Sequence, residues 1–322
     1  MPTPTRKTNT FHSLIYNGLI GFYVGRKIPG IKQLWHGLWR WSSERYNGNV
    51  TTNLFEFNLV INNGNPLPVV HRQYPHFNTP IAAAVEAGFK LKGGPVTYVD
   101  IGVAFGDTPL LVERLVGDKV KKIVCIDGDE KFFSLLSQNL KSLGKKVQTI
   151  QTLLSDKEEQ IPMLIWERNS TAHAAGSQMQ AALPLDLVCE LYSVEPDVIK
   201  IDVDGYDGRI LAGAEKTLHE RTPVVIFEWN PALYIKCGSD LMQPFRVLEA
   251  CGYKQLVWFQ NTGPYSHTTL LNDYEGLARM ADFCQANYAR DGYHYDVLAL
   301  PTDDAAFGLE VAMSAGGFRV EV

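Results

Sequence analysis

Residues 96–108 read VTYVDIGVAFGDT, a short apolar run followed by a turn with two glycines and the start of a helix. Apolar runs of this kind recur along the chain at 96–101, 121–127, 146–150, 196–202 and 223–229. Helical patterns separate them at 106–116, 130–143, 206–220 and 240–251. Strands that alternate with helices form a parallel sheet covered on both faces, so we predict a doubly wound α/β fold. Ligands of such folds bind beyond the carboxyl ends of the strands.

Further segments flank this alternating part of the chain. Two more strands are predicted at 253–260 and 293–301, with an insertion near 261–292 that carries an acidic helix. We therefore expect a main domain over residues 95–322 and an accessory region of helices and a hairpin over residues 1–94.

Local patterns predict the elements of the accessory region. Apolar and polar residues alternate over 53–61, and a second extended run covers 67–72, which together predict a hairpin. The run from Thr79 to Leu91 begins with a capping threonine and with Pro80 in the first turn, so we predict a helix there.

The composition is that of an ordinary globular protein. Of 322 residues, 45% are hydrophobic and 20% charged, which excludes bulk disorder, and the net charge of −5 argues against nucleic acid as a partner. Widely spaced cysteines without a CxxC pair predict reduced thiols and a cytoplasmic protein. They are Cys125, Cys189, Cys237, Cys251 and Cys284.

The charge is unevenly distributed along the chain. Residues 1–50 contain seven Lys and Arg against Glu44 alone, a charge of +6 that leaves −11 for the remainder. Trp35, Trp39 and Trp41 lie among these basic residues. Residues 1–46 therefore allow two interpretations: peripheral contact with the inner face of an anionic membrane, or docking of an N-terminal helix onto the protein body, which we favour.

The turn after the first predicted strand has the features of a nucleotide-type site. Gly102 and Gly106 allow a tight turn and close approach of a ligand to the backbone, but the spacing is not the GxGxxG of dinucleotide-binding folds. A carboxylate at Asp100 would repel a pyrophosphate, whereas it can hold the ammonium group of S-adenosylmethionine. The alternative is that Asp100 only caps the turn.

Two further acidic positions extend this hypothesis. Asp127 ends the second predicted strand 21 residues after Gly106, a spacing that suits recognition of ribose hydroxyls. Asp129 can serve instead, although we favour it as the cap of the following helix. Ser155 and Asp156 follow the third strand, where a carboxylate can accept from the adenine amino group, or where the pair simply makes a turn.

The fourth strand ends in an acidic cluster. Residues 197–218 read DVIKIDVDGYDGRILAGAEKTL, which places Asp202, Asp204 and Asp207 just before a helix. The carboxyl end of a central strand is where a doubly wound fold places its chemistry, so we expect these carboxylates to be functional.

Together these motifs resemble the FkbM family of S-adenosylmethionine-dependent methyltransferases. The matching segments are DIGVAFG (100–106), IDGD (126–129), LSD (154–156), KIDVDGYD (200–207) and PVVIFEW (223–229). The resemblance implies a Rossmann-like class I methyltransferase sheet, mostly parallel with an antiparallel final strand. It adds Ala104, where the family has asparagine, and Gly128 to the cofactor site, together with Asp202. Shorter carboxylates at Asp127, Asp204 and Asp207 replace glutamates of the family pattern.

The resulting hypothesis is an O-methyltransferase acting on a hydroxyl of a glycan, glycolipid precursor or polyketide-type acceptor. Deprotonating a hydroxyl needs a base, for which Asp202 is the first candidate, followed by Asp204 and Glu228. His173 and His267 are candidates because their segments are expected to rim the cleft. Carboxylates also bind hard divalent ions, but we predict no metal site.

Two other functions compete with this one. A catalytically silent fold that only binds is the main alternative, supported by Ala104 and the shortened carboxylates. A nicotinamide-dependent oxidoreductase is disfavoured because the GxGxxG turn is absent. The sequence does not indicate an oligomeric state.

Overall fold

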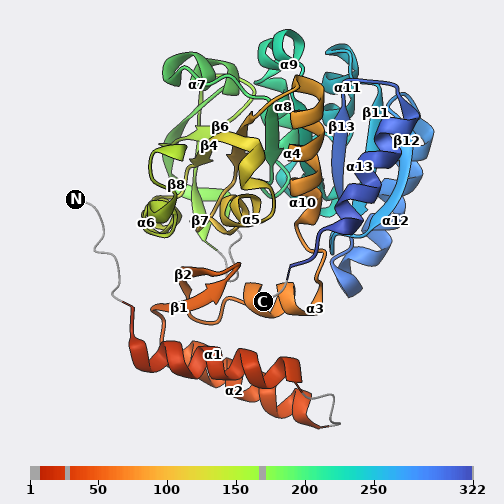
Figure 1. Ribbon diagram of the computed structural model, residues 1–322. Helices are drawn as coiled ribbons and strands as arrows, with labels where there is room; N and C mark the ends of the chain where they lie inside the picture. Colours follow the sequence, from red (N-terminus) through yellow and green to blue (C-terminus); the bar gives the residue numbers. More distant parts are fainter. Residues whose placement is uncertain (1–7, 26–29, 167–171, 321–322) are drawn as a thin grey trace.

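The computed structural model describes residues 8–25, 30–166 and 172–320. Its centre is an eight-stranded sheet with the order β12-β11-β13-β10-β9-β3-β4-β5 (Figure 1). The strands are β3 (Val96–Ile101), β4 (Val120–Asp127), β5 (Val147–Gln151), β9 (Val198–Ile201), β10 (Val224–Trp229), β11 (Gln255–Gln260), β12 (Tyr265–Leu270) and β13 (Tyr295–Leu300).

The strand directions confirm the predicted fold class. Strands β5, β4, β3, β9 and β10 are parallel to one another, and β13 lies antiparallel between β10 and β11. The chain leaves β3 toward β4 on one side and later returns to β9 on the other. This reversal of strand order puts the topological switch point at the carboxyl ends of β3 and β9, where doubly wound folds bind their ligands.

Helices cover both faces of the sheet because alternate strand residues point to opposite sides. One face packs on α4 (Thr79–Lys92), α5 (Asp107–Val116), α6 (Glu130–Asn139) and α13 (Ala305–Gly317). The other packs on α7 (Leu185–Tyr192), α8 (Asp207–Ala212), α9 (Glu215–Arg221), α10 (Pro231–Cys237), α11 (Gln243–Ala250) and α12 (Tyr274–Asp291). One helix was predicted where the structure has α8 and α9, which are separated at Gly213 and Ala214. A Cβ on Gly213 would lie 2.2 Å from the Ser155 carbonyl oxygen, so the glycine allows that close approach.

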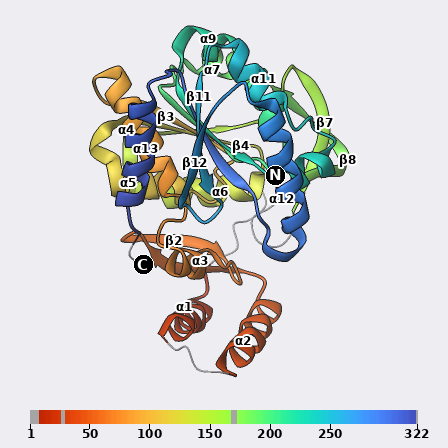
Figure 2. The same cartoon turned by 90° about the vertical axis from the view of Figure 1, so that its right-hand side faces the viewer.

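The accessory region lies at one end of the molecule, where α1 and α2 lie farther from the sheet than the other three elements (Figures 1 and 2). Apart from α4, which packs on the sheet, its elements are α1 (Thr10–Gly25), α2 (Ile31–Arg45), β1 (Asn49–Leu54), β2 (Phe57–Asn62) and α3 (Leu67–Gln73). The predicted hairpin is wrong in position: Phe55 and Glu56 adopt left-handed conformations and make the turn inside the first predicted strand. The second predicted strand is helix α3, because Pro68 lies in its first turn and its fixed backbone angle suits a helix start.

Two local predictions also need correction. The capping position of α4 is Asn78, since Thr79 already lies in the helix and its hydroxyl donates to the His76 carbonyl. The segment around His173, which was expected to rim the cleft, lies from residue 172 onward in a second, three-stranded sheet. That sheet consists of β6 (Leu153–Leu154), β7 (Glu159–Trp166) and β8 (Ala172–Leu183).

Within the described ranges, no helix combines the length and the apolar character that crossing a membrane requires. All five cysteines are free thiols.

Candidate active site

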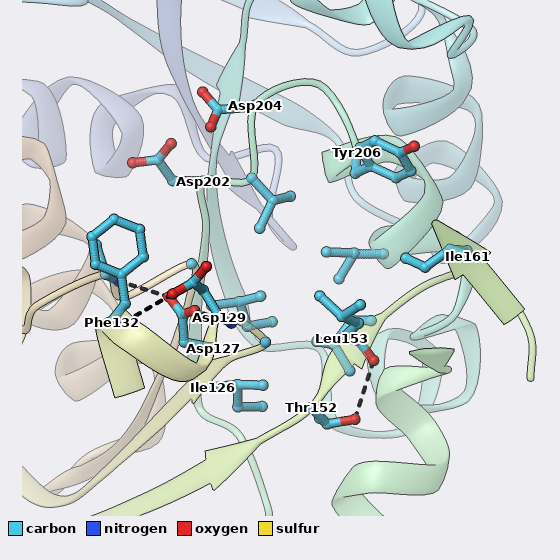
Figure 3. A pocket seen from close by; sticks show the side chains of 17 residues that line it. Ile126, Asp127, Asp129, Phe132, Thr152, Leu153, Ile161, Asp202, Asp204 and Tyr206 are labelled. Atoms are coloured by element: carbon cyan, nitrogen blue, oxygen red, sulfur yellow. Dashed lines mark hydrogen bonds between the residues drawn. The ribbon is translucent and has the colours of Figure 1, made fainter. Parts of the chain in front are cut away.

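A cavity lies at the carboxyl ends of β3, β4 and β9 (Figure 3). Asp202 and Asp204 lie at one end of it and Thr152 at the other, and Asp127 lies between them. Its apolar wall consists of Ile101, Ile126, Phe132, Leu153, Leu154, Ile161, Val203 and Ile210. An apolar slot with acidic groups along one side can take a flat ring and a hydroxylated sugar together.

The turn after β3 forms the floor of this cavity. Gly102 has a φ of 75°, and a Cβ on it would lie 1.9 Å from the Asp202 carbonyl oxygen. Only glycine therefore lets the β3 turn approach the chain after β9 this closely. Ala104 has a φ of 48°, a left-handed conformation that a residue with a side chain seldom adopts. Both residues line the cavity.

Asp127 is held rigidly at the end of β4. One carboxylate oxygen accepts from the Ala104 amide at 2.8 Å and the other from the Asp129 amide at 2.9 Å. Burial raises the pKa of Asp127 to about 6, although these two amides favour the charged form. Each oxygen keeps a lone pair, so the carboxylate can still accept from two hydroxyls.

The neighbouring residues Gly128 and Asp129 also line the cavity. The side chain of Asp129 accepts from the Lys131 and Phe132 amides, which confirms it as the cap of α6. A Cβ on Gly128 would lie 2.1 Å from the Leu153 side chain, so Gly128 leaves room for this leucine where the β4 turn meets β6.

Asp100 lies in the protein interior rather than on the cavity wall. Its carboxylate accepts from the hydroxyls of Tyr98 and Thr108 and lies 3.1 Å from the Lys200 ammonium. Burial would lower the pKa of Lys200, but Asp100 and Asp202 outweigh it and raise that pKa. Asp100 thus has a cation from the protein itself, and it lines neither of the two cavities at the strand ends.

A second cavity adjoins the first at the same strand ends. Gly102, Ala104, Asp202 and Asp204 line both cavities, so the two meet at these residues. The second cavity continues between the sheet and the accessory region, whose contribution is Asn65, Pro66, Leu67, Val70, Phe77 and Asn78. Asp202 exposes 48% of its side chain at this junction.

An acidic pair with a histidine forms the far wall of the second cavity. Glu228 and Asp296 lie opposite each other on β10 and β13, and His294 Nε2 is 3.4 Å from Glu228 Oε2. His294 Nδ1 lies 2.7 Å from the Gly292 carbonyl oxygen. Since a carbonyl oxygen can only accept, Nδ1 is the donor of this hydrogen bond. Burial would lower the pKa of His294, but Glu228 and Asp296 outweigh it and raise that pKa. Burial also raises the pKa of Asp296 to about 7.

Several predicted residues lie away from both cavities. Ser155 and Asp156 turn toward α8, where Asp156 accepts two hydrogen bonds from Arg209 and Ser155 donates to Glu159. Gly106 precedes α5 and packs against α6 side chains. Asp207 is fully buried at the start of α8, where it accepts from the Gly205 amide.

The two predicted histidines differ from His294 in position. His267 lies on the edge strand β12 and stacks on Trp258 at a ring distance of 5.5 Å; it lines neither cavity. His173 lies in β8, and its side chain is outside the described part of the structure.

The sequence analysis missed His294 and Asp296. They lie next to and within β13, whose direction is opposite to that of its neighbours, so its start reaches the same sheet edge as the ends of β9 and β10. The run YHYD ahead of an antiparallel closing strand was the available signal. Among the residues that the structure describes, no group of three or more acidic, histidine or cysteine side chains is placed to hold a metal ion.

Residues 100–254 match the family described as the methyltransferase FkbM domain. The chain carries an FkbM methyltransferase domain. The expected class, an S-adenosylmethionine-dependent methyltransferase, is thereby confirmed for this domain. Both cavities are built largely from it, while His294, Asp296 and the accessory wall lie outside the matched range. No curated protein matches the chain by sequence.

Solved structures similar to this chain include methyltransferases. The FkbM methyltransferase of Methylobacillus flagellatus KT is 14% identical with a TM-score of 0.42; the match covers 64% of this chain and 43% of that one. The O-methyltransferase from Bacillus cereus, in complex with SAH, is 14% identical with a TM-score of 0.38, over 68% of this chain and 79% of that one. The matched part of this chain therefore spans less than half the length of the Methylobacillus protein.

Proposed function

We propose that the protein is an S-adenosylmethionine-dependent O-methyltransferase that binds its cofactor in the first cavity and a hydroxyl-bearing acceptor in the second. The observation that supports this most is the junction of the two cavities at Gly102, Ala104, Asp202 and Asp204. A methyl donor on one side of such a junction can face an acceptor on the other, which is what an in-line displacement needs.

The residues of the first cavity fit this cofactor. The Asp127 carboxylate can accept from a ribose diol, and the apolar wall around Phe132 and Leu153 suits an adenine ring. Asp202 and Asp204 offer negative charge at the other end, where a positively charged sulfonium and ammonium would be stabilised. The cofactor supplies an electrophilic methyl group.

The second cavity supplies groups that can take a proton. As the acceptor oxygen is methylated, its hydroxyl proton must leave, and Asp202 at the junction is the proposed proton acceptor. The pair of Glu228 and His294 lies on the same cavity and is the next candidate. Asp204 also lines the junction and adds negative charge there.

The charges of the second cavity favour an uncharged acceptor. Five carboxylates, those of Asp107, Asp202, Asp204, Glu228 and Asp296, line it together with Lys200 and His294. Because like charges repel, this surplus of acid disfavours an anionic group near the junction. A hydroxyl of a glycan, of the sugar part of a glycolipid precursor, or of a polyketide fits this environment.

Calorimetric titration with S-adenosylhomocysteine and with NAD tests the cofactor assignment. We expect micromolar binding of S-adenosylhomocysteine only, weakened strongly by Asp127→Ala. Asp156→Ala is the matched control, because that carboxylate pairs with Arg209 outside the cavity. Binding of NAD, or equal binding by the Asp127 and Asp156 variants, would contradict the assignment.

A screen of polyol, glycoside and polyketide hydroxyls with radiolabelled S-adenosylmethionine separates the enzyme from a silent binding module. Turnover that falls in Asp202→Asn while S-adenosylhomocysteine still binds supports the proposed base. Cofactor binding without transfer to any member of the screen would favour the silent fold, for which the left-handed Ala104 in place of asparagine is the structural argument.

A further inference from the structure

We infer that the helical hairpin formed by α1 and α2 docks on an anionic membrane surface and holds the second cavity next to the lipid headgroups. The starting observation is a set of exposed apolar side chains at the free end of the molecule. They are Phe11 (66% exposed) and Leu14 (69%) on α1, and Leu34 (57%), Leu38 (40%) and Trp41 (49%) on α2.

These side chains form stripes rather than scattered positions. Leu34, Leu38 and Trp41 are spaced i, i+4 and i+7, so they share one side of α2. Phe11 and Leu14 lie on the side of α1 opposite the buried Tyr16 and Ile20. Such stripes are left exposed although the hairpin already has an apolar interface of its own.

Trp35 and Trp39 of α2 lie in the interface between the two helices. Trp35 is buried, stacks on Trp39 at 4.9 Å and donates to the Leu19 carbonyl at 2.8 Å. Trp35 and Trp39 therefore join the two helices to each other. Trp41 remains outside, with the Arg45 guanidinium 5.7 Å from its ring centre. An exposed tryptophan beside arginine is typical of side chains that lie at a lipid headgroup boundary.

The charge of the hairpin indicates that the surface it docks on is anionic. Helix α2 carries Lys32, Arg40 and Arg45 against Glu44, and α1 carries no charged residue. The first fifty residues have a charge of +6, whereas the rest of the protein has −11. Anionic lipid attracts such a basic end while repelling the acidic body, and each basic residue near the surface strengthens binding.

The hairpin is also connected to the second cavity. The Tyr16 hydroxyl donates to the Asn65 carbonyl at 2.5 Å, and Asn65 lines that cavity. A docked hairpin would thus fix the cavity wall close to the membrane, where a hydroxyl on a lipid-linked acceptor is presented. This last step rests on the proposed function, whereas docking itself does not.

Vesicle flotation of the full-length protein tests the docking. We expect binding to phosphatidylcholine vesicles that contain phosphatidylglycerol, and binding weaker by about tenfold or more to pure phosphatidylcholine. The variant Leu34→Gln, Leu38→Gln, Trp41→Gln should lose about tenfold or more in partitioning, since the stripe can no longer enter the headgroup region. The matched control is Leu191→Gln, Ile235→Gln, Leu309→Gln, which changes three exposed apolar residues of the body and should bind as before.

A charge variant and a sizing experiment complete the test. Lys32→Gln with Arg40→Gln should reduce binding to phosphatidylglycerol vesicles and leave the weak binding to phosphatidylcholine unchanged. Failure of the wild-type protein to bind phosphatidylglycerol vesicles at low salt overturns the inference. A dimer in light scattering that the α2 triple variant abolishes would also overturn it, because the stripe would then be the contact between two copies of the protein. Calorimetry with S-adenosylhomocysteine on the same preparations distinguishes failure of docking from failure of the proposed function.

Discussion

Removing the Lys200 charge should destabilise the protein strongly, because this ammonium is the partner of a carboxylate that water does not reach. Asp100 is fully buried, and Lys200 exposes only 5% of its side chain. In Lys200→Met the Tyr98 and Thr108 hydroxyls still donate to Asp100, but the negative charge has no cation beside it. Breaking a buried pair in this way costs about 3–5 kcal/mol. That is a large part of the 5–15 kcal/mol by which most domains are stable.

Urea denaturation followed by tryptophan fluorescence measures this loss. The double variant Asp100→Asn, Lys200→Met should recover about 2 kcal/mol or more, since it removes both charges together. The pKa of Lys200 is raised, so its stabilisation is complete below the unfolded-state pKa of about 10.4 and is lost only above it. The deficit of Lys200→Met should therefore be constant between neutral pH and pH ~9. A deficit below about 1 kcal/mol, or a double variant as unstable as the single one, would refute this account of the pair.

The other predictions concern the turns around the first cavity. Asp127→Asn should weaken S-adenosylhomocysteine binding about tenfold to a hundredfold at neutral pH, by loss of a charged acceptor. Wild-type affinity should fall as pH drops below about 6, the raised pKa of Asp127, while the variant shows no such step in calorimetry. Gly102→Ala should cost about 3 kcal/mol or more, because its Cβ meets the Asp202 carbonyl and its φ is left-handed; a calorimetric Tm close to wild type would contradict this. Asp129→Ala should cost about 1 kcal/mol in denaturation as a lost helix cap, with binding retained; loss of binding at unchanged stability would instead make Asp129 a ligand residue.

The parallel strands were predictable because each is largely buried on both faces and is therefore mostly apolar. This holds for β3, β4, β9 and β10, whose predicted and observed limits differ by two residues or fewer. Strand β12 (YSHTTL) was missed because an edge strand is half exposed and carries polar residues. Strands β7 and β8 were missed for a related reason: they pair with each other, so pairing rather than an apolar pattern makes this segment extended.

The site was predictable where it lies in local turns and unpredictable where distant segments meet. Gly102, Ala104, Asp127 and Asp202 come from strand-end motifs and line the cavities. Asp100 is paired with Lys200, which is 100 positions away in the sequence. A local motif around Asp100 could not predict this contact. The accessory wall of the second cavity and the position of His294 likewise follow from tertiary packing alone.

The accessory region forms one wall of the second cavity, through residues between Asn65 and Asn78. Hydrogen bonds from residues near the C-terminus, which are synthesised much later, hold this wall on the body of the protein. The Val320 amide donates to the Pro75 carbonyl, and the His76 ring bonds the Phe318 carbonyl across 242 positions. His294 and Asp296 also come from this late part of the chain. On the ribosome, the first cavity can therefore assemble before His294 and Asp296 complete the far wall of the second. The hydrogen bonds that hold the accessory region in place form later still. A nascent chain would acquire the proposed methyl-donor site before the proposed acceptor site, and the order of synthesis would delay the joining of the two.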